Sequence, residues 1–574
     1  MAEPQQALTV DSQLIAKVFE DAPDRVRRRL DRNPTAADDW GWQQSGDACT
    51  IDTGSETVTI SRRHIDSLEQ VSCTCLLAPR CFHVLACMSR LRVTAEDEAS
   101  EDRTEPAATE AVDLIEISDA QGAAARQMTK SLSGLLRTGV ANAGVVALST
   151  LMRAVHQARA EGLHRLAAIG LRIITGVGRV RTSAQESDPD QLAVDFAAAL
   201  ETARQVRGEE PIPLFWIGTA RRQQHPVGGR RLYGLLAEPV MTDSGYAGAG
   251  VYFIGEDDQI YTVSEVRPGD AQVARDAYAG GIELGPVVLP AKHLARHVLL
   301  GSNLTASADG RLGRGRDVKV AEQRASSWLE DPIARRFEQP FCDQCEVIFQ
   351  ASNNPIVSQR AGWNFVFLRG RVLGAAGPEL LFHVDQTEQC VRLAIANEQP
   401  ALCFRENLRM LCHTSGLKLS VVGRLDLEDP NKVYPLALME AEGSELSLPE
   451  SFGGRVFMGL DELQSRNLPN RLPKPIHAGS GVVSSDADPL AALRRRWIGS
   501  MLAGMGRRGQ SDSRLVQQEI SDLTRRGFDT GAKLLHALSS SVDVDAGAEM
   551  TFLATAIYLR NCRRAWRWNA LDRK

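Results

Sequence analysis

Three cysteines and one histidine lie within eleven residues in the amino-terminal part of this chain. Cys73 and Cys75 form a Cys-x-Cys pair, and Cys81 and His83 form a Cys-x-His pair after a spacer of five residues. Thiolate sulfur and imidazole nitrogen are ligands that Zn²⁺ favours, and four of them complete the tetrahedral coordination of a structural site. The sequence therefore predicts a zinc site built from these four residues.

The segments around the two pairs indicate strands followed by a helix. Residues 57–60 and 71–73 are predicted strands, and side chains two apart in a strand share a face, so Cys73 and Cys75 point the same way. Apolar residues recur at helical spacing after His83, which places Cys81 and His83 at the start of an amphipathic helix. The positive end of a helix favours thiolates. We expect a zinc-stabilised ββα module over residues 55–93.

Two other interpretations of these cysteines stay open at this point. The thiols could be unligated members of a small core, although such a core does not require a histidine two residues after the third cysteine. Cys87 lies one helical turn beyond His83 and could compete as a ligand. We expect Cys87 to pack in the core instead.

The spacing of the four residues resembles the SWIM zinc finger, whose pattern is Cys-x-Cys, a variable gap, and Cys-x-His leading into a helix. All four ligand positions match over residues 55–93, with a gap at the short end of the range. Residues 76–83, 244–248 and 304–310 also resemble segments of a bacterial family of large SWIM proteins. That resemblance implies an intracellular protein of a family that is often encoded beside MoxR-type AAA ATPases and von Willebrand A-domain proteins. SWIM modules elsewhere are taken to bind DNA or other proteins.

The bulk properties of the chain indicate a soluble, intracellular protein. Its 574 residues are enough for roughly three to five domains. The first twenty residues lack the pattern of a signal peptide, and no uncharged apolar stretch is long enough to span a membrane. The eleven cysteines are odd in number and widely spread, which does not fit a disulfide framework. We expect a cytoplasmic location.

Composition and periodicity predict an α+β multidomain protein. Helical spacing dominates residues 121–210, whereas strand-like runs bounded by turn residues begin near residue 211. The predicted parts are an N-terminal helix and lead-in strand (1–54), the SWIM zinc finger (55–93), an acidic linker (94–120), a helical bundle (121–210), a β-rich domain (211–335), an OB-like β-barrel (336–450) and a basic C-terminal helical region (451–574).

The order of elements in residues 363–442 is that of an OB barrel. Strands are predicted at 365–372, 380–384 and 390–396, a helix at 404–413, and two further strands at 417–425 and 432–439. OB barrels often bind oligonucleotides, but many serve only in assembly.

Charge is distributed unevenly along the chain. Residues 96–119 contain ten acidic residues against the single base Arg103, which is typical of a disordered linker. From Ala491 onward there are fifteen Lys or Arg and eight Asp or Glu, with Trp566 and Trp568 among the arginines. Such a basic end could bind phosphates, or it could be an ordinary solvated surface or a dock for an acidic partner.

Three further motifs contain metal-binding residue types. Cys342 and Cys345 are half a zinc site and would need two more ligands, for which Cys390, Cys403, Cys412 and His413 are candidates. His293 and His297 have the spacing of a helical metal pair but lack the glutamate of a His-Glu-x-x-His protease, so hydrolytic zinc is not supported. The acidic turn at 256–258 could bind a cation, but such residues are more often turn formers.

The sequence offers no catalytic motif, and we assign no catalytic or cofactor-binding residue. The glycine-rich segment 310–315 lacks the Gly-Lys-Ser/Thr ending of a phosphate-binding loop, and there is no Gly-x-Ser-x-Gly elbow. We expect a zinc-binding, non-enzymatic adaptor that docks a protein partner, with the AAA ATPase implied by the resemblance as a candidate. The alternative is a nucleic-acid-binding protein that uses the zinc finger, the OB-like barrel and the basic end. An enzyme whose site is assembled from distant residues is a third class.

Overall fold

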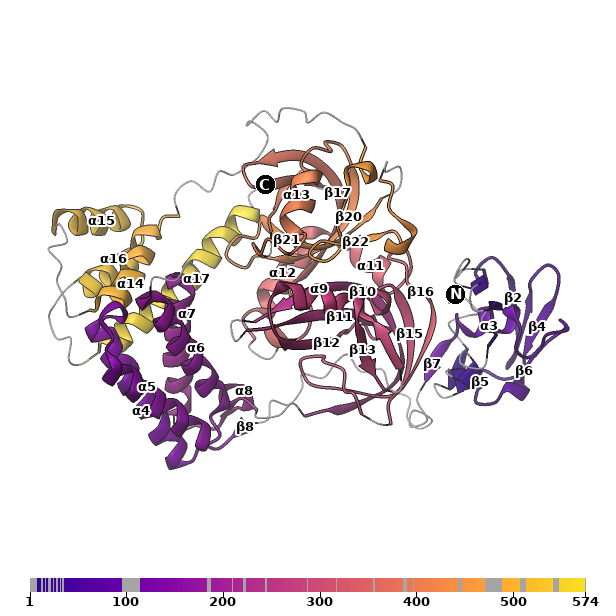
Figure 1. Cartoon of the computed structure of the whole chain (residues 1–574), viewed down its shortest axis with the longest axis horizontal. Helices are drawn as coiled ribbons and strands as arrows, with labels where there is room; N and C mark the ends of the chain where they lie inside the picture. The colour runs from indigo at the N-terminus through magenta and orange to yellow at the C-terminus, as the bar shows by residue number, and fades with distance from the viewer. Residues whose placement is uncertain are drawn as a thin grey trace. The chain divides into compact units, whose positions relative to one another are not determined.

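A computed structural model gives the fold of the chain (Figure 1). It describes residues 8–94, 114–469 and 488–572, apart from gaps at 12–13, 16, 19–21, 24, 27–28, 31–32, 34–35, 183–186, 209, 220–222, 243–244, 286, 316, 355–356, 386–389, 396, 442–445, 506–512 and 540–546. Two compact units are formed, one by residues 1–104, 223–481 and 574, the other by 105–222 and 482–573. No helix in the described ranges is long and apolar enough to cross a membrane. The mixed α+β class is confirmed.

The two cysteine-containing pairs lie in a small module of the first unit, which we call the metal module and define as residues 41–94. Its main sheet has the order β2-β3-β4-β6, from the strands Gly41–Ser45, Ala48–Asp52, Thr57–Ile60 and Val71–Cys73. The helix α3, Phe82–Met88, packs against this sheet. The predicted strands and helix are confirmed, and the sheet extends back to Gly41. A second, three-stranded sheet joins β1 (Thr9–Asp11), β5 (His64–Ile65) and β7 (Arg92–Thr94).

The middle of the first unit is built on an antiparallel five-stranded sheet. Its order is β12-β11-β10-β15-β16, from Ile260–Pro268, Tyr246–Gly255, His225–Met241, His297–Ala306 and Lys319–Ala325. A two-stranded sheet of β13 (Gly281–Leu284) and β14 (Val287–Pro290) follows α9 (Ala271–Ala279), and α10 (Ala291–Leu294) leads directly toward β15. The predicted hairpin at residues 255–259 joins β11 and β12.

The strands predicted for an OB barrel are all present and pair as that fold requires. They are β17 (Phe365–Ala376), β18 (Glu379–Val384), β19 (Cys390–Leu393), β20 (Lys418–Leu425) and β21 (Lys432–Glu440). The helix α13, Phe404–Leu411, lies between the third and fourth strands in the chain. The parallel pairing of β19 with β21 nearly closes the sheet, and β22 (Arg455–Phe457) extends it. The OB-like prediction is therefore confirmed at the level of strand order and pairing.

The β-rich sheet and the OB-like barrel share one hydrophobic core. Aromatic and aliphatic residues of both halves, such as Phe253 and Phe457, belong to the same buried cluster. Buried charge also joins them, because Arg296 contacts Asp461 over 2.7 Å with both side chains less than a tenth exposed. The connecting helices are α11 (Ile333–Glu338) and α12 (Phe341–Ala351). The two parts therefore form a continuous body.

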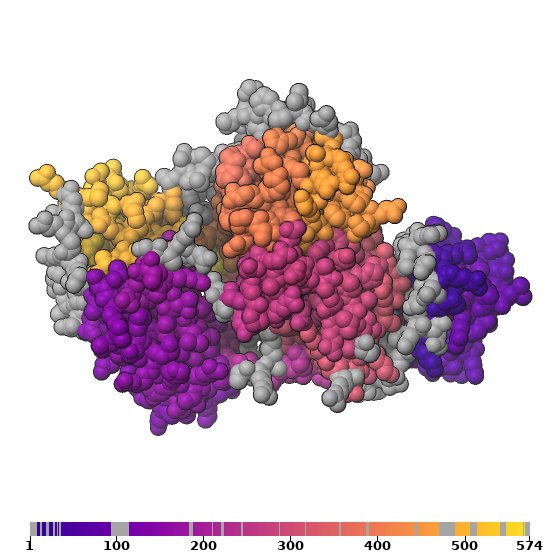
Figure 2. All heavy atoms as spheres, in the orientation of Figure 1, coloured from indigo at the N-terminus to yellow at the C-terminus, as the bar shows by residue number. Residues whose placement is uncertain are grey.

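The second unit is helical. The predicted bundle consists of α4 (Asp119–Thr138), α5 (Val145–Ala160), α6 (His164–Arg181) and α7 (Pro189–Val206). The C-terminal helices α14 (Ala491–Ala503), α15 (Ser513–Arg525), α16 (Asp529–Ser539) and α17 (Ala548–Asp572) share its core, and Figure 2 shows the purple and yellow atoms of the two sets side by side. The short elements β8 (Leu114–Ile115), β9 (Ile212–Pro213) and α8 (Leu214–Ile217) complete the unit.

Some predictions fall on residues outside the described ranges. The acidic linker runs largely through 95–113, the helix predicted within residues 1–54 is described only in part, and the side chains of Trp566 and Arg567 are not described. The finer domain boundaries stay predictions.

Candidate metal centre

The Cys-x-Cys pair is held in a turn at the end of β6. Between the two cysteines, Thr74 turns back to β4: its backbone N–H donates to the carbonyl of Thr57 over 3.1 Å, and its hydroxyl accepts from the Thr57 N–H over 3.0 Å. The Thr74 hydroxyl also donates to the carboxylate of Glu56. Because Thr74 is hydrogen-bonded to the neighbouring strand β4, the positions of Cys73 and Cys75 on either side of it are fixed relative to the sheet.

The Cys-x-His pair is placed by the first turn of α3. Cys81 is the N-cap of this helix, and its sulfur accepts a hydrogen bond from the Val84 N–H over 3.4 Å. His83 packs beside Trp40 and Phe82, with ring centroids 5.9 and 5.8 Å away. The helix N-terminus therefore lies next to the Cys81 sulfur, and the hydrogen bond from the Val84 N–H favours the Cys81 thiolate, but burial has the larger effect and leaves the pKa of this thiol raised.

The four side chains converge on one point. One ligand atom from each of Cys73, Cys75, Cys81 and His83 can be chosen so that all lie within 4.8 Å of one another. The Cys73 sulfur lies 3.8 Å from Nδ1 of His83. Zinc bonds of about 2.3 Å to sulfur and 2.0 Å to nitrogen in a tetrahedron separate such atoms by about 3.6 Å. The Cys₃His cluster could thus hold a metal ion such as zinc with little rearrangement.

Burial and hydrogen bonding act in opposite directions on the three thiols, and the pKa of Cys75 is lowered because its burial is outweighed by its hydrogen bonds together, of which that with Cys81 has the largest effect. Burial raises the pKa of Cys81 to about 12 and also raises the pKa of Cys73, so both thiols hold their protons at neutral pH. Burial, together with the positive charge of Arg29, lowers the pKa of His83, which keeps this imidazole neutral. A metal ion would displace the thiol protons and find the histidine lone pair already available.

Cys87 is not part of the cluster. It is fully buried in α3 and belongs to the core of the metal module together with Cys49. The expectation that Cys87 packs in the core is confirmed.

The loop between the two pairs exposes apolar side chains. Leu76 is fully exposed and Leu77 is 56% exposed, and residues 76–80 are all exposed. This loop begins directly after the ligand Cys75 and ends at the ligand Cys81. A metal bound by both pairs would therefore fix both ends of an apolar loop.

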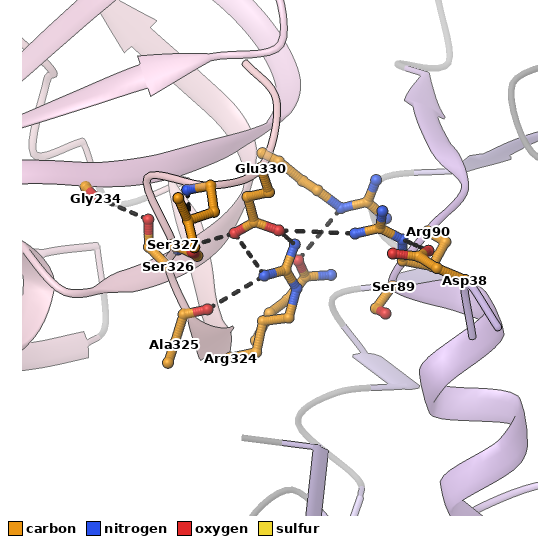
Figure 3. A network of polar contacts seen from close by, with 12 residues as sticks. Asp38, Ser89, Arg90, Gly234, Arg324, Ala325, Ser326, Ser327 and Glu330 are labelled. Atoms are coloured by element: carbon orange, nitrogen blue, oxygen red, sulfur yellow. Dashed lines mark hydrogen bonds and ion pairs between the residues drawn. The ribbon is translucent and has the colours of Figure 1, made fainter. Parts of the chain in front are cut away.

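The metal module contacts the segment that follows β16 through partly buried polar side chains (Figure 3). Arg90, two residues after α3, lies between Asp38 at 2.6 Å and Glu330 at 3.7 Å. Glu330 in turn accepts two hydrogen bonds, of 2.7 and 2.6 Å, from the buried Arg324 and a third from the Ser327 N–H. Leu300 of β15 also belongs to the core of the metal module. Sequence reasoning gave no signal for this anchoring.

The other predicted metal-binding motif does not gather a ligand set. Cys342 is exposed and Cys345 buried in α12, and within the described residues no group of three or more ligand types includes either of them. The acidic turn of the β11–β12 hairpin binds arginines: Glu256 contacts Arg231, Asp257 contacts Arg230, and Asp258 contacts Arg335. These carboxylates therefore serve as ion-pair partners.

A second group of ligand types forms where the sequence showed only a histidine pair. Glu322 of β16 joins His293 and His297, and one ligand atom of each lies within 4.8 Å of the others. Because Glu322 comes from a neighbouring strand, no local motif could have indicated it.

Many arginines of the basic C-terminal region have acidic partners within the helical unit. Arg496 bonds to Glu519 over 2.9 Å, and Arg563 contacts Asp488 over 2.7 Å. Further pairs join Arg494 to Asp190, Arg495 to Glu519, Arg525 to Asp522 and Arg560 to Glu201. The clusters are thus at least partly neutralised from within.

Comparison of this chain with protein-family models, with curated proteins and with solved structures gave no match.

Proposed function

We propose that the metal module is a zinc-dependent protein-docking module of a non-enzymatic adaptor. The observation that carries the proposal is the apolar loop of Leu76 and Leu77, which is exposed and bounded on both sides by metal ligands. Exposed apolar side chains grouped at one place are typical of interaction sites. The zinc ion would hold the ends of the loop, so that the leucines are presented in a fixed arrangement and little ordering entropy is lost on binding.

The anchoring of the module supports this function. The contacts of Arg90 with Glu330 and of Arg231 with the end of α3 attach the module to the β-rich body. A docking element on an adaptor must hold its partner in a fixed position relative to the rest of the protein. Hydrogen-bonded contacts restrict the movement of the module more than a flexible linker would. The identity of the module as a SWIM finger is part of the proposal and is supported by the four matching ligand positions.

The test is a binding experiment with a defined partner. The resemblance to SWIM proteins makes a MoxR-type AAA ATPase the first partner to try and a von Willebrand A-domain protein the second. Full-length protein should capture the partner, and a Leu76→Ser, Leu77→Ser double variant should lose at least tenfold in affinity, about 1.4 kcal/mol. Val288→Ser, which alters a 64% exposed valine of β14, is the matched control and should bind as wild type does. Equal binding by the double variant would refute the assigned loop.

The OB-like strand order supports a second candidate, nucleic-acid binding. OB barrels bind oligonucleotides on the face of strands 2 and 3 and at the loop between the fourth and fifth strands. The charges in this region of the barrel weaken the nucleic-acid candidate, because its basic side chains are paired with carboxylates. On β19, Arg392 is bonded to Glu379 and Asp429, and Lys432 lies 3.4 Å from Glu379. The loop between β20 and β21 also contains the acidic residue Asp426. Binding of single-stranded DNA that weakens steeply with salt would favour this candidate.

A further inference from the structure

His293, His297 and Glu322 meet on the five-stranded sheet, outside the metal module. His293 is in the short helix α10, His297 is the first residue of β15, and Glu322 is in the adjacent β16. The two imidazole rings stack with centroids 3.8 Å apart and an interplanar angle of 19°. The same carboxylate oxygen, Oε1 of Glu322, lies 2.7 Å from Nε2 of His293 and 3.4 Å from Nε2 of His297.

The backbone fixes which nitrogen of His297 faces the carboxylate. Nδ1 of His297 lies 2.9 Å from the carbonyl oxygen of His293, and a carbonyl can only accept, so Nδ1 carries the hydrogen. In the neutral ring, Nε2 then carries no hydrogen, and its lone pair is directed toward a carboxylate oxygen. Two acceptors at this separation repel one another unless a cation lies between them. Metal-binding histidines are commonly oriented in this way, by a backbone carbonyl that accepts from the other ring nitrogen.

The distances suit a first-row transition metal. Ligand atoms at about 2.0 to 2.1 Å from a tetrahedral ion are separated by about 3.3 Å. Nε2 of His297 and Oε1 of Glu322 are already 3.4 Å apart. The gap between His293 and Glu322 must widen by about 0.6 Å to reach the tetrahedral separation. The His293 side chain is 37% exposed and is the most accessible of the three, so a small rotation can supply this movement.

We propose that His293, His297 and Glu322 form a second metal site, for a divalent ion of intermediate softness such as Zn²⁺, Co²⁺ or Ni²⁺. Two imidazoles and one carboxylate are a ligand set for such ions. Three protein ligands leave a coordination position open to water or to a substrate group, unlike the closed Cys₃His set. The site uses no residue of the metal module, so its test does not depend on the function proposed above.

The test is metal uptake by the full-length chain. After one equivalent of Zn²⁺ has filled the cysteine site, added Co²⁺ should bind as a second equivalent, with d–d absorption but without thiolate-to-cobalt charge transfer. His297→Gln and, as a second and more exposed variant, His293→Gln should each weaken the second binding at least about tenfold. His225→Gln, at an exposed histidine of β10, is the control and should leave two equivalents.

The outcomes separate the two sites. The Cys75→Ser variant should lose the thiolate-bound metal and keep the histidine-bound one. If wild-type protein stops at one equivalent, or if both histidine variants still take up two, the second site is refuted. A second equivalent with thiolate charge transfer would also refute it, because the metal would then be bound elsewhere.

Discussion

Arg231 of β10 donates a hydrogen bond from Nη2 to the carbonyl oxygen of Met88, the last residue of α3, over 2.9 Å. Its Nη1 also donates to the carbonyl of Leu91 and lies 3.1 Å from Glu256. The last carbonyls of a helix lack partners within the helix, and a cation near them is favourable. The helix that carries Cys81 and His83 at its beginning is thus capped at its end by the β-rich body.

Replacing Arg231 should loosen this attachment without removing the metal. In Arg231→Met, the two carbonyls and Glu256 lose a buried charged donor, so the free energy of unfolding should fall by about 2 to 3 kcal/mol. Urea unfolding measures the change, and zinc content should stay at the wild-type value. The control Arg62→Met alters an exposed arginine of the metal module and should change stability by less than about 0.5 kcal/mol. Equal stabilities for the two variants would contradict the capping role.

Glu330 should be one of the most sensitive positions in the first unit. Arg324 is only 1% exposed and has two of its hydrogen bonds with the Glu330 carboxylate (Figure 3). Glu330→Gln would leave a buried guanidinium without its counter-charge, which costs about 3 kcal/mol or more. Urea unfolding of this variant should be compared with Glu283→Gln, at an exposed position of β13. If the free energy of unfolding changes by less than about 0.5 kcal/mol in both variants, the network around Glu330 contributes little to stability.

Loss of one zinc ligand should unfold the metal module alone. Since a zinc ion contributes its binding free energy to folding, Cys75→Ser should release the thiolate-bound metal and expose the backbone of β2, β3, β4, β6 and α3 to exchange. Hydrogen–deuterium exchange should show this loss of protection while α4 to α7 stay as in the wild type. Cys342→Ser, at an exposed cysteine outside the cluster, should retain both metal and protection. Retention of a thiolate-bound zinc by Cys75→Ser would count against the ligand assignment.

Metal retention should fail on the acid side. The pKa of His83 is lowered from its ordinary value of 6.5 by burial, so its neutral form is favoured by folding. A lowered pKa contributes stability that is present above 6.5 and is lost as the pH falls through the folded value. Protons then also compete with the metal for the three thiolates. A chelating dye should report zinc release that begins below about pH 6.5, and full retention down to about pH 4 would be the contrary result.

The parts of the structure that sequence predicted are those whose signal is local. The four ligands lie within eleven residues, so their spacing and the helix start after Cys81 sufficed to predict the group, although β6 ends at Cys73 and Cys75 lies in the turn after it rather than on the same strand. The OB-like order was also readable, because turn residues bound each strand and Gly416, with φ of 86°, ends the segment after α13. In both cases, nearby residues determine the local geometry.

The rest depends on contacts between residues far apart in the chain. Glu322 is 25 positions from His297 and joins it only because β15 and β16 are neighbours. Arg231 is 143 residues from Met88. The arginines of α14 to α17 look the same in sequence whether they face solvent or pair with Glu519 and Asp488. Such relationships need the tertiary fold, since neither spacing nor composition encodes them.

X-ray absorption at the zinc edge on the full-length His297→Gln variant, purified without chelators, tests the Cys₃His zinc site most directly. This variant keeps the Cys₃His cluster and should lose the second site, so the spectrum reports a single environment. We expect one zinc per chain, with three sulfur neighbours at about 2.3 Å and one nitrogen at about 2.0 Å. A protein without bound metal, or a zinc ion with no sulfur neighbours, would contradict this assignment.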